Sequence, residues 1–96
     1  MPRFEEHCAE SLRLFGKPYE EVHRWLDEFA GAQGCGYRHR RKRHHEAGIQ
    51  EVVNLFGPEA GEVARRHIIT DLMEEGWTDQ DHFPLNEADY VKMGLF

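Results

Sequence analysis

Apolar residues recur every three or four positions along most of the chain, which is the spacing of amphipathic helices. With glycine and proline as boundaries, the pattern predicts four helices, at about residues 4–15, 18–31, 37–56 and 58–75. A shorter helix is expected to follow Asn86, which can cap it, and to run through residue 93. No stretch shows the period of two that is typical of a strand. The sequence therefore predicts an all-α protein: one domain, residues 1–96, forming a small bundle of about four helices plus a short C-terminal helix.

The expected buried faces follow from the same spacing. The first helix is expected to bury Phe4, Cys8, Leu12 and Phe15. The long third helix contains Gly48, where it is expected to bend or split. The tail is expected to be pinned onto the helices by Trp77, Phe83, Leu85, Tyr90 and Phe96.

Histidine and aspartate interrupt two of these apolar faces at helical spacing. His67 and Asp71 are four residues apart within the apolar stripe of the fourth predicted helix, so their side chains share one face. His23 and Asp27 repeat this arrangement in the second helix. Such pairs also occur as purely structural hydrogen bonds, and that interpretation of each pair stays open.

Two further segments direct histidine inward. His7 lies beside Phe4 and Cys8, and His45 is in line with the apolar residues of the third helix, while His44 points about 100° away. Burying one imidazole unpaired costs roughly 1–3 kcal/mol. One shared polar site is therefore a more economical explanation than several separate buried rings.

Imidazole and carboxylate are ligands that suit Zn, Fe, Ni or Mn, and the facing helices of a bundle can converge them on one divalent ion. The candidate ligands are His67 and Asp71 first, then His23 and His44 or His45, and Asp27 either as a ligand or as the group that orients His23. Candidates for supporting positions are His7, His39 and Arg38. Three protein ligands with one open position could activate water for hydrolysis, whereas four ligands would make a structural site. The sequence leaves both open.

Charge is distributed unevenly. The 12 Lys and Arg against 18 Asp and Glu give a formal net charge of −6, with no general attraction for nucleic acid or an anionic membrane. Five cations are concentrated in one segment: Arg38, Arg40, Arg41, Lys42 and Arg43. They are candidates for phosphate or nucleic-acid contact, which would weaken steeply with salt. On a helix they would spread around the circumference, so pairing with Glu20, Glu21, Glu28 or the acidic tail is the favoured interpretation.

The remaining features suggest a cytoplasmic location. Cys8 and Cys35 make no disulfide framework, and Cys8 is expected to be a small core residue. No apolar run approaches the ~18 residues of a membrane span. The first residues lack the long apolar stretch of a signal peptide.

The order of the candidate residues resembles a family of small uncharacterised proteins from bacteria and phages. The matching elements are His7 with Ser11, Phe15 with Gly16, residues 23–27 (HRWLD), residues 38–40 (RHR), His44 with His45, Gly48 with Ile49, Phe56 with Gly57, and His67 and Ile68 with Asp71. They cover about residues 7–71. The segment between Phe56 and His67 is shorter than in relatives, and the tail differs. No established activity attaches to that family, so the resemblance supports the choice of residues and implies nothing about a reaction or substrate.

Three functions follow from these observations. The leading one is a small helical metal-binding protein with a His/Asp site between helices, for which metal-dependent hydrolysis is a further expectation. The second is a non-enzymatic interaction module, including a homodimeric one, whose His–Asp pairs are structural. The third is a nucleic-acid accessory protein that uses residues 38–43. Whether the protein is an enzyme is left open by the sequence.

Overall fold

The computed structural model describes residues 4–28 and 40–95, with the backbone alone at residues 40 and 41. The described residues form helices and no strand, in this order: α1 (Phe4–Phe15), α2 (Glu20–Leu26), α3 (Arg40–Arg43), α4 (Glu46–Phe56), α5 (Pro58–Glu74) and α6 (Glu87–Lys92). The predicted all-α class is confirmed, and α1, α5 and α6 match their predicted bounds to within a residue. None of the described helices has both the length and the apolar character needed to span a bilayer.

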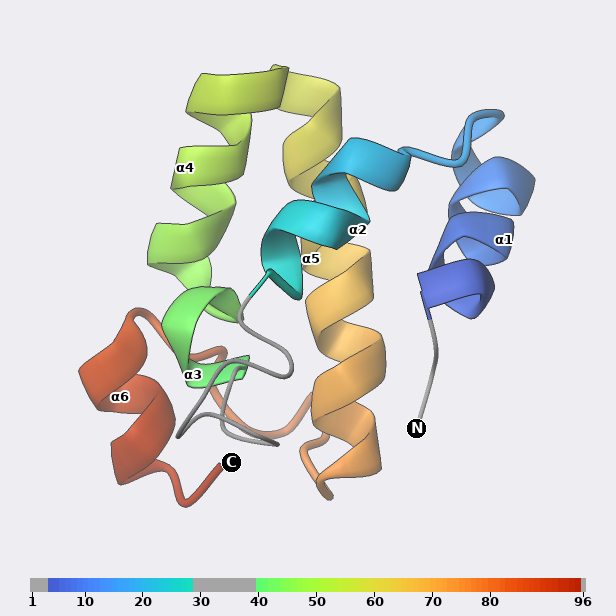
Figure 1. Ribbon diagram of the computed structural model, residues 1–96. Helices are drawn as coiled ribbons and strands as arrows, with labels where there is room; N and C mark the ends of the chain where they lie inside the picture. The colour runs from blue at the N-terminus through green and yellow to red at the C-terminus, as the bar shows by residue number, and fades with distance from the viewer. Residues whose placement is uncertain (1–3, 29–39, 96) are drawn as a thin grey trace.

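The long helix α5 lies at the centre of the arrangement. α4 packs against it after the reversal at Gly57, α2 crosses it, and α1 lies on the side of α5 away from α4 (Figure 1). Gly57 has φ 101°, a left-handed value that glycine adopts without a steric penalty. α3 and α6 contact each other beside the beginning of α4. Side chains of α1, α2 and α4 can therefore meet on the surface of α5.

The apolar core lies mainly between α2, α4 and α5, and its buried members are Val22, Leu26, Ile49, Val52, Ala60, Val63, Ala64, Ile68, Leu72 and Tyr90. Burying one large aliphatic side chain contributes about 1.5–3 kcal/mol, which makes this face the main source of stability. α4 and α5 approach closely at Gly61, where a Cβ atom would lie 2.5 Å from a methyl carbon of Val53.

The tail docks as predicted at three of its five aromatic or apolar positions. Trp77 and Phe83 pack against the core, and Tyr90 is fully buried. The prediction for Leu85 is wrong: its side chain is 61 % exposed, because it is the backbone carbonyl of Leu85 that faces α4 and accepts a hydrogen bond from the N–H of Ala47. Phe96 lies outside the described residues.

The predicted helix over residues 37–56 divides at His44 and His45 instead of at Gly48. His45 has an extended backbone and caps α4, since its Nδ1 accepts a hydrogen bond from the N–H of Gly48 at 3.1 Å. Gly48 therefore lies in the first turn of α4, where a Cβ atom would lie 1.9 Å from the carbonyl oxygen of Arg43. The break turns His44 into the interior, where it is fully buried.

The second predicted helix is shorter at both ends. It begins at Glu20 because Tyr19 has a left-handed backbone, φ 52°, and its hydroxyl donates a hydrogen bond to Glu59 of α5. It ends at Leu26, and Asp27 follows as the C-cap residue. Residues 29–31, the last of the predicted helix, lie outside the described residues.

α1 has the predicted bounds but not the predicted buried face. Leu12 is 54 % exposed and Cys8 is only partly buried, whereas His7 and Ser11 are the buried residues of this helix. The predicted apolar face of α1 is therefore confirmed at Phe15, which packs against the core, and wrong at Leu12. The reason is that the buried face of α1 packs against the polar side chains of His23, His67 and Asp71.

Candidate metal centre

The interior contains an unusual number of polar side chains for a chain of this size. Among the residues whose side chains the structure describes, seven polar ones are at most 4 % exposed: His7, Ser11, His23, His44, His45, His67 and Asp71. Buried polar groups are normally hydrogen-bonded or bound to an ion, because an unpaired one lowers stability. The arrangement of these residues shows how that requirement is met.

Four residues from three parts of the chain meet at one point. α5 supplies His67 and Asp71 one turn apart, the break before α4 supplies His44, and the C-cap of α2 supplies Asp27. One ligand atom from each of the four lies within 4.8 Å of all the others. We call these four residues the tetrad.

The distances within the tetrad join nitrogen to oxygen. Nε2 of His44 lies 3.1 Å from Oδ2 of Asp71 and 3.5 Å from Oδ1 of Asp27. Nε2 of His67 lies 3.3 Å from the same oxygen of Asp71 and 3.4 Å from Oδ2 of Asp27. The two imidazoles thus point toward the two carboxylates.

These spacings fit a shared cation. A tetrahedral zinc ion with ligands at 2.0–2.1 Å would hold its ligand atoms about 3.3–3.4 Å apart, within the range of the observed N–O separations, and one of the two Asp27 oxygens that make these contacts would be the ligand. One of the four contacts, from Nε2 of His44 to Oδ2 of Asp71 at 3.1 Å, has the length of a hydrogen bond, whereas the other three are longer than the usual range of about 2.7–3.2 Å. Nε2 of His67 is fully buried and makes no hydrogen bond within the described residues, although two carboxylate oxygens lie near it. The donor set, two imidazoles and two carboxylates, is one that zinc, iron, nickel or manganese accepts.

A second group of potential ligands, His7, His23 and His67, adjoins the tetrad. Its geometry is poor for a metal ion, because a ligand imidazole holds the ion in the plane of its ring. The rings of His7 and His67 are stacked, with centroids 3.7 Å apart and planes 15° from parallel, so no ion can lie in both planes. The planes of His44 and His67 in the tetrad are inclined by 57° and can intersect at one ion. The tetrad is therefore the better candidate.

The second group instead forms hydrogen bonds behind the tetrad. Nδ1 of His67 is hydrogen-bonded to Nδ1 of His23 at 2.7 Å, and Nε2 of His23 is hydrogen-bonded to the hydroxyl of Ser11 at 2.7 Å. Nε2 of His7 lies 3.3 Å from Oδ1 of Asp71, the oxygen that does not face the tetrad imidazoles. Both tetrad residues of α5 are thus contacted from behind.

Burial and neighbouring charge shift the pKa values of the cluster in opposite directions. Burial lowers the pKa of His44 to about 4, and burial together with the nearby His67 and His7 lowers that of His23 to about 3. Burial also disfavours the charged form of His67, but the carboxylates of Asp27 and Asp71 outweigh it and raise the pKa to about 8. Burial opposes ionisation of Asp71, yet its contacts with His44, His67 and His7 hold its pKa well below the usual range. His67 therefore provides a site where a proton and a metal ion would compete.

The structure brings together most of the residues predicted for the site. Four of the six candidate ligands, Asp27, His44, His67 and Asp71, form the tetrad, and His23 lies directly behind it. His45 is not in either group of potential ligands among the described residues. Its two ring nitrogens contact the N–H of Gly48 and the carbonyl of Lys42, which places it at the helix cap.

The three residues predicted to support the ligands have different outcomes, and one residue beside the tetrad was not predicted. His39 and Arg38 lie outside the described residues, whereas His7 adjoins the tetrad, with its Nε2 3.3 Å from Oδ1 of Asp71. Ser11 was not predicted as part of the site. The available signal was its spacing, since Ser11 follows His7 by four residues and so shares its helix face.

The basic segment is partly neutralised within the protein. Arg43 pairs with Glu28 and its guanidinium lies 3.9 Å from the centre of the Trp25 ring. Nζ of Lys42 lies 3.7 Å from Glu87 in the tail. The predicted intramolecular pairing is confirmed for these two cations. Nucleic-acid contact through residues 38–43 stays a prediction, because Arg38 and the side chains of residues 40 and 41 lie outside the described part.

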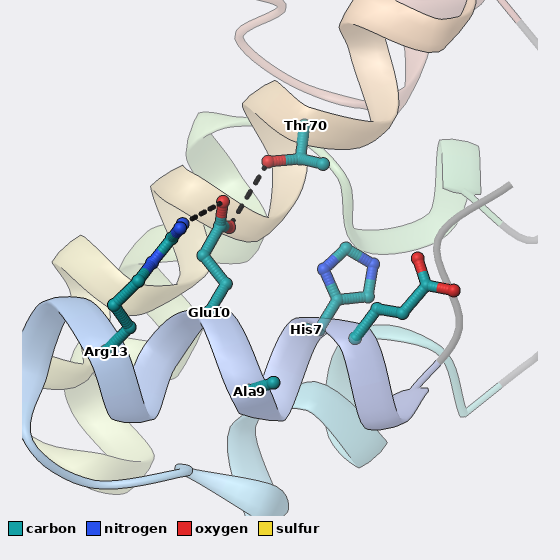
Figure 2. Close-up of a pocket in the computed structure, with 6 residues that line it drawn as sticks. His7, Ala9, Glu10, Arg13 and Thr70 are labelled. Carbon is teal, nitrogen blue, oxygen red and sulfur yellow. Dashed lines mark hydrogen bonds and ion pairs between the residues drawn. The ribbon is translucent and has the colours of Figure 1, made fainter.

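An open pocket of about 410 Å³ lies between α1 and α5, on the outer side of the cluster. His7 lines it at one end, and Glu10 lies between Arg13 and Thr70 at the other (Figure 2). Since His7 also contacts Asp71, this side chain separates the pocket from the tetrad.

Comparison with known proteins gives one match. The sequence model of a family described as Domain of unknown function (DUF6915) matches residues 3–93. No curated protein and no solved structure matches the chain.

Proposed function

Because the chain belongs to the DUF6915 family, whose function is unknown, we propose a role from the site itself: this protein binds one divalent transition-metal ion in the tetrad of Asp27, His44, His67 and Asp71. The observation that carries the proposal is the set of four N–O separations, 3.1–3.5 Å, that the imidazoles of His44 and His67 make with the two carboxylates, and the buried Nε2 of His67 makes no hydrogen bond among the described residues. A cation at the centre would satisfy that nitrogen and both carboxylates together.

The donor types favour zinc, iron, nickel or manganese. Copper(I) prefers soft sulfur ligands, and the only cysteine among the described residues, Cys8, is partly buried and belongs to neither group of potential ligands. Two carboxylates would compensate the charge of a divalent ion, so the filled site would be neutral when both imidazoles are neutral. A neutral complex lowers the cost of burying the charge.

Asp27 gives this site a side that faces solvent. Its side chain is 27 % exposed, whereas those of His44, His67 and Asp71 are at most 3 % exposed. Three buried ligands with one exchangeable position are typical of catalytic metal sites, in which the metal lowers the pKa of a bound water. We therefore propose metal-dependent hydrolysis as the activity, with Asp27 as the ligand that water can displace.

The decisive experiment is elemental analysis of protein purified without a His-tag, followed by zinc titration after chelation. We expect one equivalent of metal per chain and a thermal midpoint that rises with free zinc. The variant His67→Ala should bind none. His82→Ala is the matched control, because His82 is an exposed residue that pairs with Asp89 far from the tetrad in sequence and should leave the metal content unchanged.

The opposite result is equally clear. Substoichiometric metal in the wild type, with no stability gain from Zn²⁺, Ni²⁺, Mn²⁺ or Fe²⁺, would reject metal binding and leave the tetrad as a structural cluster. Hydrolysis is tested separately, with nitrophenyl esters and phosphate diesters. Equal rates for metal-loaded and chelated protein would reject the activity while leaving metal binding intact.

A further inference from the structure

Two pairs of polar residues, each with the spacing of one helical turn, face each other across the cluster. His7 and Ser11 lie on the buried face of α1, and His67 and Asp71 lie on the facing side of α5. His7 contacts Asp71 directly, and Ser11 reaches His67 through His23. The buried side chains of α1 thus contact either the tetrad itself or a residue directly behind it.

We propose that Ser11, His23 and His7 are positioning residues for the metal site: Ser11 and His23 hold His67 in the tautomer whose Nε2 lone pair faces the ion, and His7 orients the carboxylate of Asp71. This inference rests on the proposed function, since it concerns ligands of the same site. It assigns to α1 a role that its amphipathic pattern does not suggest.

The positions of the protons along this chain of hydrogen bonds determine the tautomer of His67. To bind a metal through Nε2, a neutral His67 must carry its proton on Nδ1, which then donates to Nδ1 of His23. His23 consequently carries its own proton on Nε2 and donates it to the hydroxyl oxygen of Ser11. Each contact is 2.7 Å long, and both imidazole N–H groups have an acceptor.

The role of His7 follows from the two oxygens of Asp71. Oδ2 faces the Nε2 atoms of His44 and His67, as a ligand oxygen should, while Oδ1 faces Nε2 of His7 at 3.3 Å. A carboxylate held at its second oxygen cannot rotate freely. The stacking of the His7 ring on that of His67, at 3.7 Å, also limits how far the His67 ring can tilt. Partners of this kind typically change metal affinity 10–100-fold when they are removed.

The competing interpretation is that the three residues merely fill the interface between α1, α2 and α5. It is distinguished by variants that keep the shape and change the hydrogen bond. His23→Leu removes the acceptor for the Nδ1 proton of His67, whereas in His23→Asn the side-chain oxygen can take the place of Nδ1. Val52→Ala, in the fully buried part of α4, is a control that lowers stability without touching the chain of hydrogen bonds.

Zinc affinity is measured by competition with a chromophoric chelator, and thermal unfolding is recorded for each metal-free variant. We expect His23→Leu to lose at least tenfold in affinity, His23→Asn to recover most of that loss, and Val52→Ala to bind as the wild type does. In the zinc-loaded wild type, ¹⁵N NMR should detect a slowly exchanging Nδ1 proton on His67 with scalar coupling to Nδ1 of His23. Ser11→Ala, a mild change that should fold, is expected to lose affinity several-fold.

The outcomes separate this inference from the proposed function. If the wild type binds zinc and His67→Ala does not, but His23→Leu and Ser11→Ala bind as tightly as the wild type, the positioning role is overturned and metal binding stands. If His23→Leu does not fold, the affinity of Ser11→Ala and the NMR coupling decide. If the wild type binds no zinc, the proposed function fails and this inference fails with it.

Discussion

The metal-free protein should be most stable near neutral pH and should lose stability steeply on the acidic side. His23 and His44 have folded pKa values of about 3 and about 4, below the ordinary value of 6.5 that applies to the unfolded chain. Between those values the unfolded chain binds more protons than the folded one, so stability rises with pH there. Their contribution to the stability of the folded protein is complete above pH 6.5. It is lost as the pH falls toward 4 for His44 and toward 3 for His23.

His67 changes the stability of the protein with pH in the opposite direction. Its folded pKa of about 8 lies above the unfolded value, so its contribution is complete below pH 6.5 and is lost as the pH rises through 8. Going from pH 7 to pH 5, His23 and His44 together lose roughly 4 kcal/mol and His67 returns a little under 1 kcal/mol. The net loss of about 3 kcal/mol is a large part of the 5–15 kcal/mol that stabilises a typical domain. From pH 7 to pH 9 the loss should be only about 1 kcal/mol.

The assay is urea unfolding, followed by circular dichroism, of chelator-treated protein at pH 5, 7 and 9. His44→Asn should remove about half of the acidic loss, because one of the two depressed groups is gone. His82→Ala should leave the shape of the curve unchanged, since His82 is an exposed residue. A free energy of unfolding that is flat between pH 7 and pH 5 would refute the reasoning, because it would mean that His23 and His44 are not buried in neutral form.

Three further predictions concern single positions. Asp27→Ala should weaken zinc binding at least tenfold and should lower the metal-free stability at neutral pH by about 1 kcal/mol, because its carboxylate helps to raise the pKa of His67; isothermal titration and urea unfolding measure the two, and unaltered zinc affinity would remove Asp27 from the ligand set. Gly48→Ala should lower stability by more than about 2 kcal/mol, since the new Cβ would lie 1.9 Å from the carbonyl oxygen of Arg43, and a thermal midpoint equal to the wild type would contradict this. His45→Ala should lower stability by about 1 kcal/mol and should also weaken zinc binding, because the break that turns His44 inward loses its cap. His45→Asn should preserve both stability and zinc affinity, since Asn is a good N-cap. Equal zinc affinity in the two variants would show that the cap does not contribute to the metal site.

The sequence was sufficient to predict those parts of the site that a single helix determines. His67 and Asp71 share a face by virtue of the helical repeat alone, and α5 has the bounds that its proline and glycine predict. The same repeat placed His23 on an inward face, and His23 is indeed buried. It could not say that His23 would meet the far side of the His67 ring, because that depends on the angle at which α2 crosses α5. Local periodicity carries no information about crossing angles.

The two errors at α1 and at residues 44–45 have a common physical origin. Sequence patterns assume that the buried face of a helix is the apolar one, and this holds only where the partner surface is apolar. α1 packs against imidazoles and a carboxylate, so the face that satisfies them, His7 with Ser11, is buried while Leu12 stays exposed. At residues 44–45 a new helix begins because the imidazole of His45 caps its N-terminus, a role usually taken by Ser, Thr, Asp or Asn. Both departures serve the same cluster: one turns His44 into the tetrad and the other covers the tetrad from behind. A polar site inside so small a chain thus reorganises the helices around it, and the positions where the apolar pattern fails are the positions that build the site.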